Sequence, residues 1–336
     1  MVAEAAAALR RGGLVLLPTA VGYVIATRAG DEAAETRLRE LTGLSRQRPL
    51  TRLLADRSAL GETVPAGAAE KLVARWWPGP LTLIYRREGE EVAVRVPAPM
   101  AVRQVLLTAG LECVATSANV AGEPPAVVAD QAMAGFGEAL ELVLDGGPVA
   151  PDVEPTVVRM TDDGRPEVLR EGVIAADEVI AAAARTIVFV CTGNTCRSPM
   201  AEGLLRDALA RRLAIAPEQL PHAGWQVLSA GTAAAPGAAV SPHSVAAMAD
   251  RGIDISGHRA RPLVPSLLES ADVVYGLTPG HVATICGWMP EYGDKVRPLD
   301  PAGVPDPFGG SPAHYRRCAD HIEGKIQGLL AEMKGG

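Results

Sequence analysis

The sequence predicts an α/β protein built from two domains, and three observations support that prediction. The chain has 336 residues, which is long enough for two domains of ordinary size. Hydrophobic residues make up 48% and charged residues 21%, so both domains should bury substantial cores. Short apolar runs alternate with helix-like segments along the chain, which is typical of sheets covered by helices. We expect a mixed sheet with helices in the first domain and a central parallel sheet flanked by helices in the second domain.

The first predicted domain covers residues 1–174 and should contain several short strands. Apolar runs bounded by Pro, Gly or polar residues predict strands at residues 14–19, 23–27, 81–87, 91–97, 112–117, 140–147 and 156–160. Helix-like pieces, among them residues 31–41 and 67–76, lie between these runs. This order of elements fits either an α/β or an α+β domain.

The second predicted domain covers residues 186–336, after a linker at residues 175–185. A strand at residues 186–190 runs into a glycine-containing loop and then into a helix pattern at residues 199–213. Further segments at residues 225–231, 245–253, 271–278 and 295–300 precede a terminal helix from about His314 to Lys334. Because strands and helices alternate here, the sheet of this domain should be parallel.

Charge and cysteine content argue against several classes of protein. The net charge of −7 disfavours a protein that coats nucleic acid nonspecifically. The five cysteines are odd in number and scattered, which favours a reducing cytoplasm over a secreted, disulfide-stabilised domain. Charged residues such as Arg185 interrupt the longest apolar stretches, so we expect no membrane association. The predicted location is the cytoplasm.

The segment VCTGNTCRSPMAE at residues 190–202 carries the strongest chemical signal. A loop that leaves a strand and enters a helix directs backbone N–H groups inward, which suits a phosphate dianion. Arg197 can close such a cradle with two parallel hydrogen bonds, and Ser198 and Pro199 suit the start of a helix. Cys191 would lie at the floor, where the amides, the helix dipole and Arg197 favour its thiolate. A thiolate beneath a bound phosphorus predicts a phosphatase rather than a mere phosphate-binding protein.

Two other interpretations of these cysteines are possible. A lone cysteine at a strand end is usually a small buried hydrophobic residue. Cys191 and Cys196 also form a C-x4-C pair, a spacing found in some metal sites. No second pair with ligand spacing follows, so we expect no metal site. The full string C-x5-R-S-P between a strand and a helix is more specific than either alternative.

The same segment closely resembles the signature of low-molecular-weight protein tyrosine phosphatases. The resemblance continues through SAGT (229–232), RGIDISGHRAR (251–261), ADVVYGLT (271–278) and DPFGGS (306–311), and so covers residues 186–334. It implies Cys191 as the nucleophile, Arg197 as the phosphate clamp and Asp306 as the general acid. It implies a supporting role for Ser229 and for the loop residues Thr192, Gly193, Asn194, Thr195, Cys196 and Ser198. The implied reaction passes through a phosphocysteine and needs no cofactor.

Thr195 bears on which phosphorylated protein is the substrate. Phosphotyrosine-directed members of the family commonly carry a larger apolar residue there, whereas protein arginine phosphatases carry threonine. The resemblance therefore implies a phosphoarginine substrate, with phosphotyrosine as the rival. In this family the position of Cys196 can form a reversible disulfide with the nucleophile, so the resemblance implies that Cys196 either pairs reversibly with Cys191 or packs in the core. Arsenate reductases share this fold but need a close pair of relay cysteines, and Cys286 and Cys318 lie 32 residues apart.

Several motifs follow one another in the first domain: LLPTAVGY (16–23), WWPGPLTLI (76–84), VAVRVPA (92–98), VATSANVAGEPPA (114–126) and VLREGVI (168–174). Their order resembles that of threonylcarbamoyl-AMP synthases, the YrdC-like family. The resemblance implies a twisted open α/β sheet that combines ATP (with Mg), threonine and bicarbonate into threonylcarbamoyl-AMP, which serves to modify adenosine 37 of tRNAs. It implies substrate contacts for Thr19 and Tyr23, nucleotide contacts for Ser117 and Asn119, and a phosphate contact for Arg95.

The first domain departs from that pattern where active members carry a Lys-x-Arg pair. A gapless match puts Thr42 and Leu44 at those positions, and a shifted match offers Arg46 and Arg48. The chain also reads PTAVGY (18–23) where the family has Pro-Thr-Glu-Thr-Val-Tyr-Gly, and PTV (155–157) where the family has Ser-Thr-Val. The domain is therefore either a divergent synthase or a noncatalytic module that binds a nucleotide, RNA, double-stranded RNA included, or a partner protein.

Overall fold

The computed structural model describes residues 1–58, 67–150 and 153–332 and divides the chain into two compact units, Met1–Ala183 and Ala184–Gly336. Helix α6 (Ala176–Ala183) occupies most of the segment expected to be a linker, residues 175–185. Its Val179 and Ala183 are buried in a core cluster of the first unit. The first unit therefore includes this helix, and strand β10 (Arg185–Cys191) of the second unit begins after Ala184.

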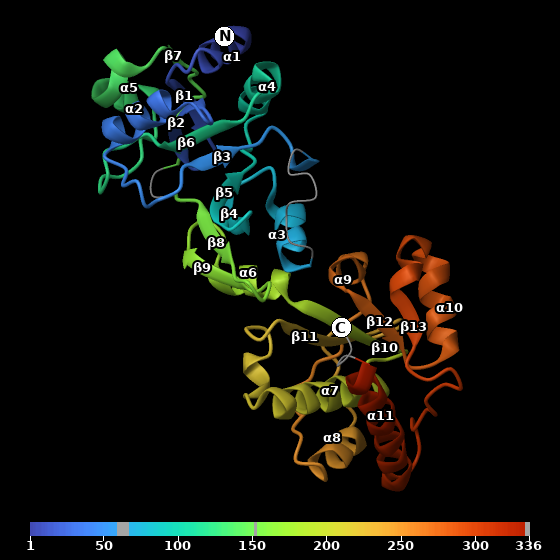
Figure 1. Cartoon of the computed structure of the whole chain (residues 1–336). Coiled ribbons are helices and arrows are strands. Elements are labelled where there is room, and N and C mark those ends of the chain that lie inside the picture. Colours follow the sequence, from blue (N-terminus) through green and yellow to red (C-terminus); the bar gives the residue numbers. More distant parts are fainter. Residues whose placement is uncertain (59–66, 151–152, 333–336) are drawn as a thin grey trace. The chain divides into compact units, whose positions relative to one another are not determined.

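The first unit is built on a mixed sheet (Figure 1). Its described strands lie in the order β7-β1-β2-β6-β3-β5-β4-β8-β9. The pairs β1–β7, β3–β5 and β4–β8 are parallel, and the other neighbours are antiparallel. The strands are β1 (Val15–Thr19), β2 (Gly22–Arg28), β3 (Thr51–Leu53), β4 (Leu81–Arg87), β5 (Glu90–Arg95), β6 (Cys113–Ser117), β7 (Leu142–Val143), β8 (Thr156–Met160) and β9 (Pro166–Arg170).

Helices cover both faces of this sheet. Besides α6 they are α1 (Val2–Arg10), α2 (Glu32–Thr42), α3 (Ala68–Trp76), α4 (Met100–Ala109) and α5 (Ala129–Phe136). Along β1, Val15 and Leu17 join a core cluster with α1 and α4, whereas Leu16 joins one with α2 and α5. Because neighbouring side chains of a strand point to opposite faces, α1 and α4 lie on one face and α2 and α5 on the other. The predicted α/β architecture is confirmed.

Some elements of the first unit differ from the prediction. The sequence does not predict β3 and β9, because both are short and lack a long apolar run. The strand expected at residues 140–147 is reduced to β7. The reason is that residues 145–147 turn away and form hydrogen bonds with the hydroxyl group of Tyr23.

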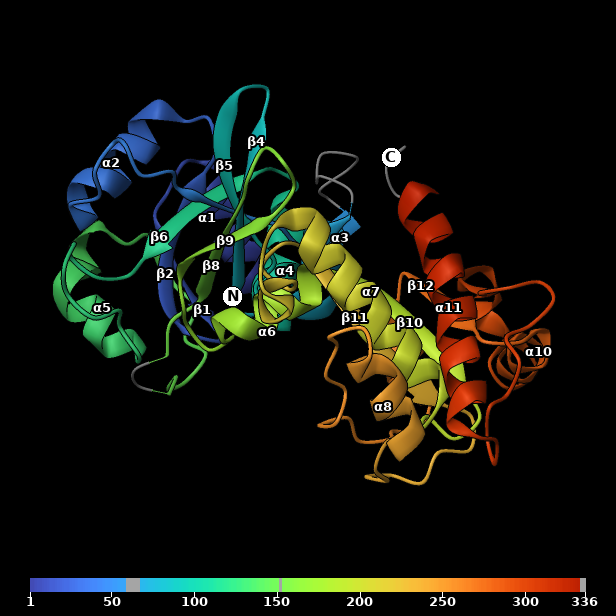
Figure 2. The same ribbon diagram turned by 90° about the horizontal axis from the view of Figure 1, so that it is seen from below.

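The second unit contains a parallel sheet in the order β11-β10-β12-β13, as predicted. Its elements after β10 are α7 (Arg197–Leu213), β11 (Trp225–Gly231), α8 (Pro242–Ala249), α9 (Pro265–Ser270), β12 (Val273–Gly276), α10 (Pro279–Trp288), β13 (Val296–Pro298) and α11 (Pro312–Glu332). Ile187 and Phe189 of β10 pack with α7, α8 and α11, whereas Val188 and Val190 pack with α9 and α10. Helices α7 and α11 lie side by side over one face of the sheet (Figures 1 and 2).

Helix α11 is the predicted terminal helix, and the expected end at Lys334 lies outside the described residues. Short 3-10 turns occur at Gly137–Ala139, Pro217–Gln219 and Pro290–Lys295. Within the described part of the chain, no helix combines the length and the apolar character needed to cross a lipid bilayer.

Candidate functional sites

The loop between β10 and α7 lies at the carboxyl edge of the parallel sheet. Cys191 ends β10 opposite Gly231 of β11. The backbone N–H groups of Thr232 and Ala233 donate to the carbonyl oxygens of Cys191 and Thr192 at 2.9 and 2.8 Å. A Cβ atom at Gly231 would lie 2.5 Å from the carbonyl oxygen of Thr192, so glycine is needed for β11 to approach this closely. The start of the loop is thus fixed by the neighbouring strand.

The thiol of Cys191 lies buried at the floor of this loop. The N–H group of Asn194 points at Sγ at 3.3 Å, and Ser198 Oγ lies 3.0 Å from it. Asn194 can aim its amide inward because its backbone is left-handed, with φ of 52°. The buried sulfur thus lies within hydrogen-bonding distance of a backbone amide and a hydroxyl group, an arrangement that suits a nucleophile.

The side chain of Asn194 holds the loop in this conformation. Its Nδ2 donates to Ser198 Oγ at 2.9 Å and to Ser229 Oγ at 2.8 Å, and its Oδ1 accepts the N–H of Arg261 at 2.9 Å. Asn194, Ser198 and Ser229 are each fully buried. Three elements that are distant in sequence, α7, β11 and the segment after α8, are thereby connected through one amide group.

Two residues of this network have no signal in the sequence. Glu202 on α7 accepts the hydroxyl proton of Ser229 at 2.6 Å. His258 reaches the carbonyl oxygen of Asn194 through Nε2 at 3.0 Å, and its Nδ1 lies 3.9 Å from Glu202. Each lies among other polar residues in its segment and no local pattern singles it out, so only the fold shows that both support the loop.

Arg197 and Asp306 face each other across the mouth of the loop. Arg197 is buried, its Nη2 lies 2.5 Å from Asp306 Oδ2, and its Nη1 donates to the carbonyl oxygen of Val304 at 3.3 Å. Its Nε is buried and has no hydrogen-bond partner among the described residues. Buried donors are nearly always paired, so an unpaired one indicates a place for a ligand. An oxyanion in the loop would supply the missing acceptor.

Thr195 and Cys196 form the part of the loop nearest to α8 and α11. The carbonyl oxygen of Thr195 accepts the N–H of Ser241 at 2.9 Å, and its side chain is half-buried. Cys196 is a free thiol whose Sγ lies 3.5 Å from the hydroxyl of Tyr315. Burial and the contact with Cys196 raise the pKa of Tyr315. Cys196 therefore has a packing role, and its disulfide with Cys191 stays a prediction.

The two remaining cysteines of the second unit do not form a pair. Cys318 packs with Ile187 and Phe189, whereas Cys286 packs with Val188 and Val190 on the opposite face of the sheet. Burial raises the pKa of the Cys318 thiol to about 12, which keeps it protonated and a poor nucleophile. This arrangement does not provide the relay pair that an arsenate reductase needs.

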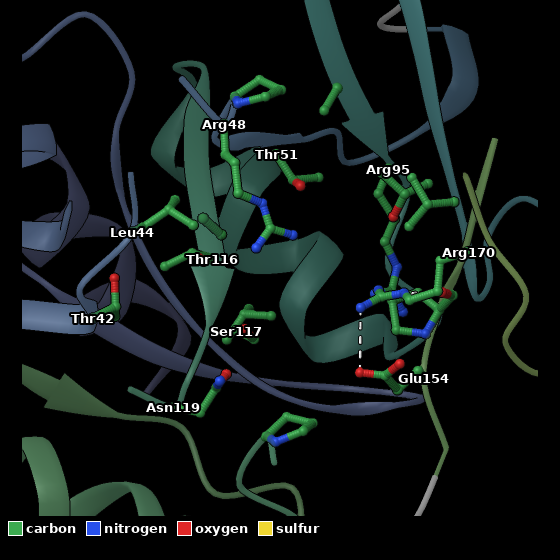
Figure 3. Close-up of a pocket in the computed structure, with 18 of the residues that line it drawn as sticks. Thr42, Leu44, Arg48, Thr51, Arg95, Thr116, Ser117, Asn119, Glu154 and Arg170 are labelled. Carbon is green, nitrogen blue, oxygen red and sulfur yellow. Dashed lines mark hydrogen bonds and ion pairs between the residues drawn. The ribbon is translucent and has the colours of Figure 1, made fainter. Parts of the chain in front are cut away.

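The first unit contains a cavity of about 650 Å³ that is lined mainly by its central strands (Figure 3). Its charged lining residues are Arg48, Arg95, Arg159, Arg170, Glu91, Glu123 and Glu154. Arg170 pairs with Glu154 at 3.2 Å and Arg159 with Glu91 at 2.8 Å. Arg48 forms no ion pair within the part of the chain that the structure describes. Figure 3 shows Arg48 on one side of the cavity and Arg95 and Arg170 on the other.

Arg95 is the most buried cation of this cavity. It is 4% exposed, and its Nε donates to the carbonyl oxygen of Gly79 at 3.1 Å. Burial and the nearby Arg170 lower its pKa to about 10, so it remains charged at neutral pH. Its Nη2 has no partner among the described residues. A buried guanidinium with a free donor, aimed into a cavity, suits an anionic ligand.

The other predicted residues of this cavity differ in whether their polar groups already have hydrogen-bond partners among the described residues. Ser117 is the last residue of β6 and Asn119 follows that strand, and the buried Oδ1 of Asn119 is unpaired among the described residues. Thr19 donates to the carbonyl oxygen of Gly22 at 2.7 Å, and Tyr23 donates to Asp145 at 2.9 Å. Thr19 and Tyr23 therefore use their hydroxyl groups to hold the cavity wall.

Comparison with known proteins identifies both units. Residues 186–335 match the model of the low molecular weight phosphotyrosine protein phosphatases, and residues 7–172 match the Sua5–YciO–YrdC model, described as telomere recombination. A protein-arginine-phosphatase of Bacillus subtilis (strain 168) is 38% identical over 44% of this chain and 96% of its own length. A low molecular weight protein-tyrosine-phosphatase of Streptomyces coelicolor is 36% identical over 44% of this chain and 93% of its own length. A putative threonylcarbamoyl-AMP synthase of Mycobacterium leprae (strain TN) is 33% identical over 53% of this chain and 86% of its own length.

The second unit belongs to the low-molecular-weight protein tyrosine phosphatase family, and the first belongs to the Sua5/YrdC family. Both resemblances found in the sequence are thereby confirmed. We call the two units the phosphatase unit and the Sua5/YrdC unit.

In the Sua5/YrdC unit, the structure separates the two alternatives for the missing Lys-x-Arg pair. Thr42 and Leu44, the gapless match, both line the cavity, and the Thr42 hydroxyl donates to the carbonyl oxygen of Leu38 at 2.8 Å. Of the shifted pair, Arg48 lines the cavity and Arg46 does not. Arg39 holds the loop in place by donating to the carbonyl oxygens of Ser45 and Arg48, each at 2.9 Å. Of these two arginines, Arg48 is therefore the one that lines the cavity.

The described residues contain no cluster of three or more His, Cys, Asp or Glu side chains that could bind a metal ion. In the phosphatase unit the positive charge at the loop comes from Arg197 and backbone amides instead.

Proposed function

We propose that the phosphatase unit hydrolyses phosphoarginine in proteins through a phosphocysteine intermediate. The observation that carries this proposal is the buried Cys191 at the floor of the loop together with Arg197, whose Nε has no partner among the described residues. A phosphoryl group in the loop would accept hydrogen bonds from the loop amides and Arg197. Its phosphorus would then be open to in-line attack by the sulfur.

The reaction balances with residues of this unit alone. The Cys191 thiolate forms a bond to phosphorus, the bond from phosphorus to the leaving nitrogen breaks, and Asp306 gives that nitrogen a proton. The resulting carboxylate then takes a proton from water, which attacks phosphorus and releases phosphate and the thiolate. Asp306 pairs with Arg197 as a carboxylate in the free enzyme, so we expect the incoming phosphoryl group to displace it and the freed carboxylate to take a proton from solvent before it acts as the acid.

Thr195 supports phosphoarginine over phosphotyrosine as the substrate. Its small, half-buried side chain lies in the loop between Asn194 and Cys196, where a larger apolar residue would narrow the mouth. The relatives from Bacillus subtilis and Geobacillus stearothermophilus are named protein-arginine-phosphatases.

The test compares phosphoarginine and phosphotyrosine peptides of one sequence, using the wild type and the Thr195→Ile variant. We expect the wild type to prefer phosphoarginine and the variant to shift toward phosphotyrosine. Cys191→Ser serves as the inactive control. An unchanged substrate ratio in Thr195→Ile would rule out a selective role for Thr195, and a wild-type preference for phosphotyrosine would establish the rival function.

We further propose that the Sua5/YrdC unit makes threonylcarbamoyl-AMP from ATP with magnesium, threonine and bicarbonate for tRNA modification. Two arginines on opposite sides of the cavity support it, because both suit the anionic groups of these substrates. Within the described part of the chain, Arg95 Nη2 has no hydrogen-bond partner and Arg48 forms no ion pair. Arg48 would supply charge that the Lys-x-Arg pair provides in other members. The rival proposal is a module that binds nucleotide without turnover.

Pyrophosphate release in the presence of ATP, threonine and bicarbonate separates the two proposals. We expect turnover that requires all three substrates and falls in Arg48→Ala, Arg95→Ala and Ser117→Ala. Arg46→Ala is the matched control, because it removes the same charge from the same loop outside the cavity. ATP binding without turnover would support the noncatalytic module, and equal losses in Arg46→Ala and Arg48→Ala would refute the role of Arg48.

A further inference from the structure

His281 is a buried histidine beside the phosphate-binding loop, and the mechanism above gives it no role. It lies in the first turn of α10 and is 7% exposed. Its Nε2 lies 3.0 Å from Thr192 Oγ1, and its Nδ1 lies 2.9 Å from Thr278 Oγ1. Both ring nitrogens therefore form hydrogen bonds, one with Thr192, which follows the nucleophile, and one with Thr278, which caps α10.

We infer that His281 is a positioning residue of the phosphatase, which holds the side chain of Thr192 in place through its Nε2. This inference rests on the proposed phosphatase function of the loop. Thr192 joins Cys191 to the rest of the loop, and its carbonyl oxygen is bound by Ala233 on the β11 side. His281 holds the side chain of the same residue from α10. Thr192 is thus anchored by two elements, one through its backbone and one through its hydroxyl.

The end of β12 explains why the imidazole reaches the loop. Gly276 ends β12 opposite Val190 of β10, one residue before the nucleophile. A Cβ atom at Gly276 would lie 2.9 Å from Val282 Cγ2 and 3.2 Å from His281 Cβ. Because the glycine has no side chain, the first turn of α10 packs closely over the end of the strand. This packing directs His281 at the adjoining loop.

The hydrogen bonds around His281 define which nitrogen carries the proton. Thr278 Oγ1 accepts the backbone N–H of His281 at 3.3 Å as the cap of α10. Its own hydroxyl proton is then available for Nδ1, which leaves Nε2 protonated and donating to Thr192. Thr192 in turn keeps its hydroxyl proton free. Because Thr192 is exposed at the mouth of the loop, that proton is available to a bound phosphoryl oxygen.

Two charged groups act on His281, Arg197 from α7 and Asp306 from the segment before α11. Burial lowers the pKa of His281 and so does Arg197, while Asp306 opposes them. The imidazole is therefore neutral at neutral pH and gains its second proton only below the usual histidine range near 6.5. That proton would end the donation from Thr278 to Nδ1. It would also place a second cation beside Arg197, in competition for Asp306.

The test measures the pH dependence of kcat and KM with p-nitrophenyl phosphate for His281→Ala, His281→Gln and Thr192→Val. We expect His281→Ala to lower kcat about tenfold with little change in KM, as for a lost hydrogen bond that positions a catalytic group. Gln can donate and accept at one end, so His281→Gln should recover most of the loss. It should also lack the decline in activity that protonation of His281 causes at acid pH.

A double-mutant cycle tests whether His281 acts through Thr192. In the Thr192→Val background we expect His281→Ala to have almost no further effect, since the bond that it removes is already absent. Additive losses, or an acid decline that persists in His281→Gln, would overturn the inference while leaving the phosphatase function intact. Turnover that survives in Cys191→Ser would overturn the proposed function and this inference with it.

Discussion

Arg197 donates to Asp306 through Nη2 while its Nε remains unpaired among the described residues. One side chain thus contacts the proposed general acid and still offers a donor to the substrate. A guanidinium can do both because its donors point in different directions in a fixed plane, which the ammonium group of lysine does not offer. At the scale of single residues, the rate enhancement that Asp306 provides as the proposed acid should therefore depend on whether the leaving group needs a proton.

Asp306→Asn should affect substrates unequally. A guanidine leaving group needs a proton, so we expect turnover of phosphoarginine peptides to fall about 10²- to 10⁴-fold, the usual contribution of a positioned acid. The p-nitrophenolate ion leaves readily without a proton, so its release should slow by less than about tenfold. Steady-state kinetics on both substrates measures the difference. Equal losses on both substrates would contradict the assignment of Asp306 as the acid.

Among the elements of the phosphatase unit, α11 anchors the segment that carries Asp306. Asp300 is buried, and its Oδ2 lies 2.6 Å from His321 Nε2 and 3.2 Å from Lys325 Nζ, both on α11. The N–H of Ala302 donates to its Oδ1 at 3.0 Å. This N–H and His321, with a smaller effect of Lys325, lower the pKa of Asp300. The carboxylate of Asp300 therefore connects the helix to the start of this segment.

Asp300→Asn should destabilise the phosphatase unit in a pH-dependent way. A carboxyl group whose pKa is lowered by folding stabilises the folded state above its unfolded value, about 3.9 for Asp. That contribution is lost as the pH falls below this value and through the folded pKa. We expect the variant to unfold at a lower temperature than the wild type near pH 7 and the difference to shrink as the pH falls below about 3.9. A difference that stays constant over this range would contradict the ionic anchor.

The sequence predicts an element well when its signal is local. The strand, loop and helix from residue 186 to residue 213 are contiguous, so apolar pattern, loop motif and helix start all point to one structure. Glu202, His258 and His281 each lie among other polar residues without a local pattern that singles them out, and the fold alone brings them to the loop. Arg46 and Arg48 are equivalent in the sequence, and only the path of the loop after α2 distinguishes them.

At the scale of the whole molecule, each unit has its own hydrophobic cores. Among the described residues, three clusters of buried residues lie in the Sua5/YrdC unit and two lie in the phosphatase unit. A domain with its own core can fold by itself. The phosphatase unit therefore contains what its proposed chemistry needs.

A fragment of residues 184–336 should be an active phosphatase. We expect its kcat/KM for p-nitrophenyl phosphate to equal that of the full chain within about twofold, because the core and the loop are complete without the first unit. A fragment of residues 184–336 with Cys191→Ser is the control. A folded but inactive fragment would show that the Sua5/YrdC unit contributes to catalysis.

The contact between Arg197 and Asp306 also offers a route to the natural substrates. In the resting enzyme the carboxylate of Asp306 pairs with the guanidinium of Arg197, which a phosphoryl group must also bind. The carboxylate therefore competes with the substrate for Arg197. Replacing Asp306 by alanine would remove the competitor together with the proton donor. Such a variant should capture phosphorylated proteins from a cell extract and release them slowly. The proteins retained by Asp306→Ala, and lost on addition of vanadate, would then identify the pathway in which this enzyme works.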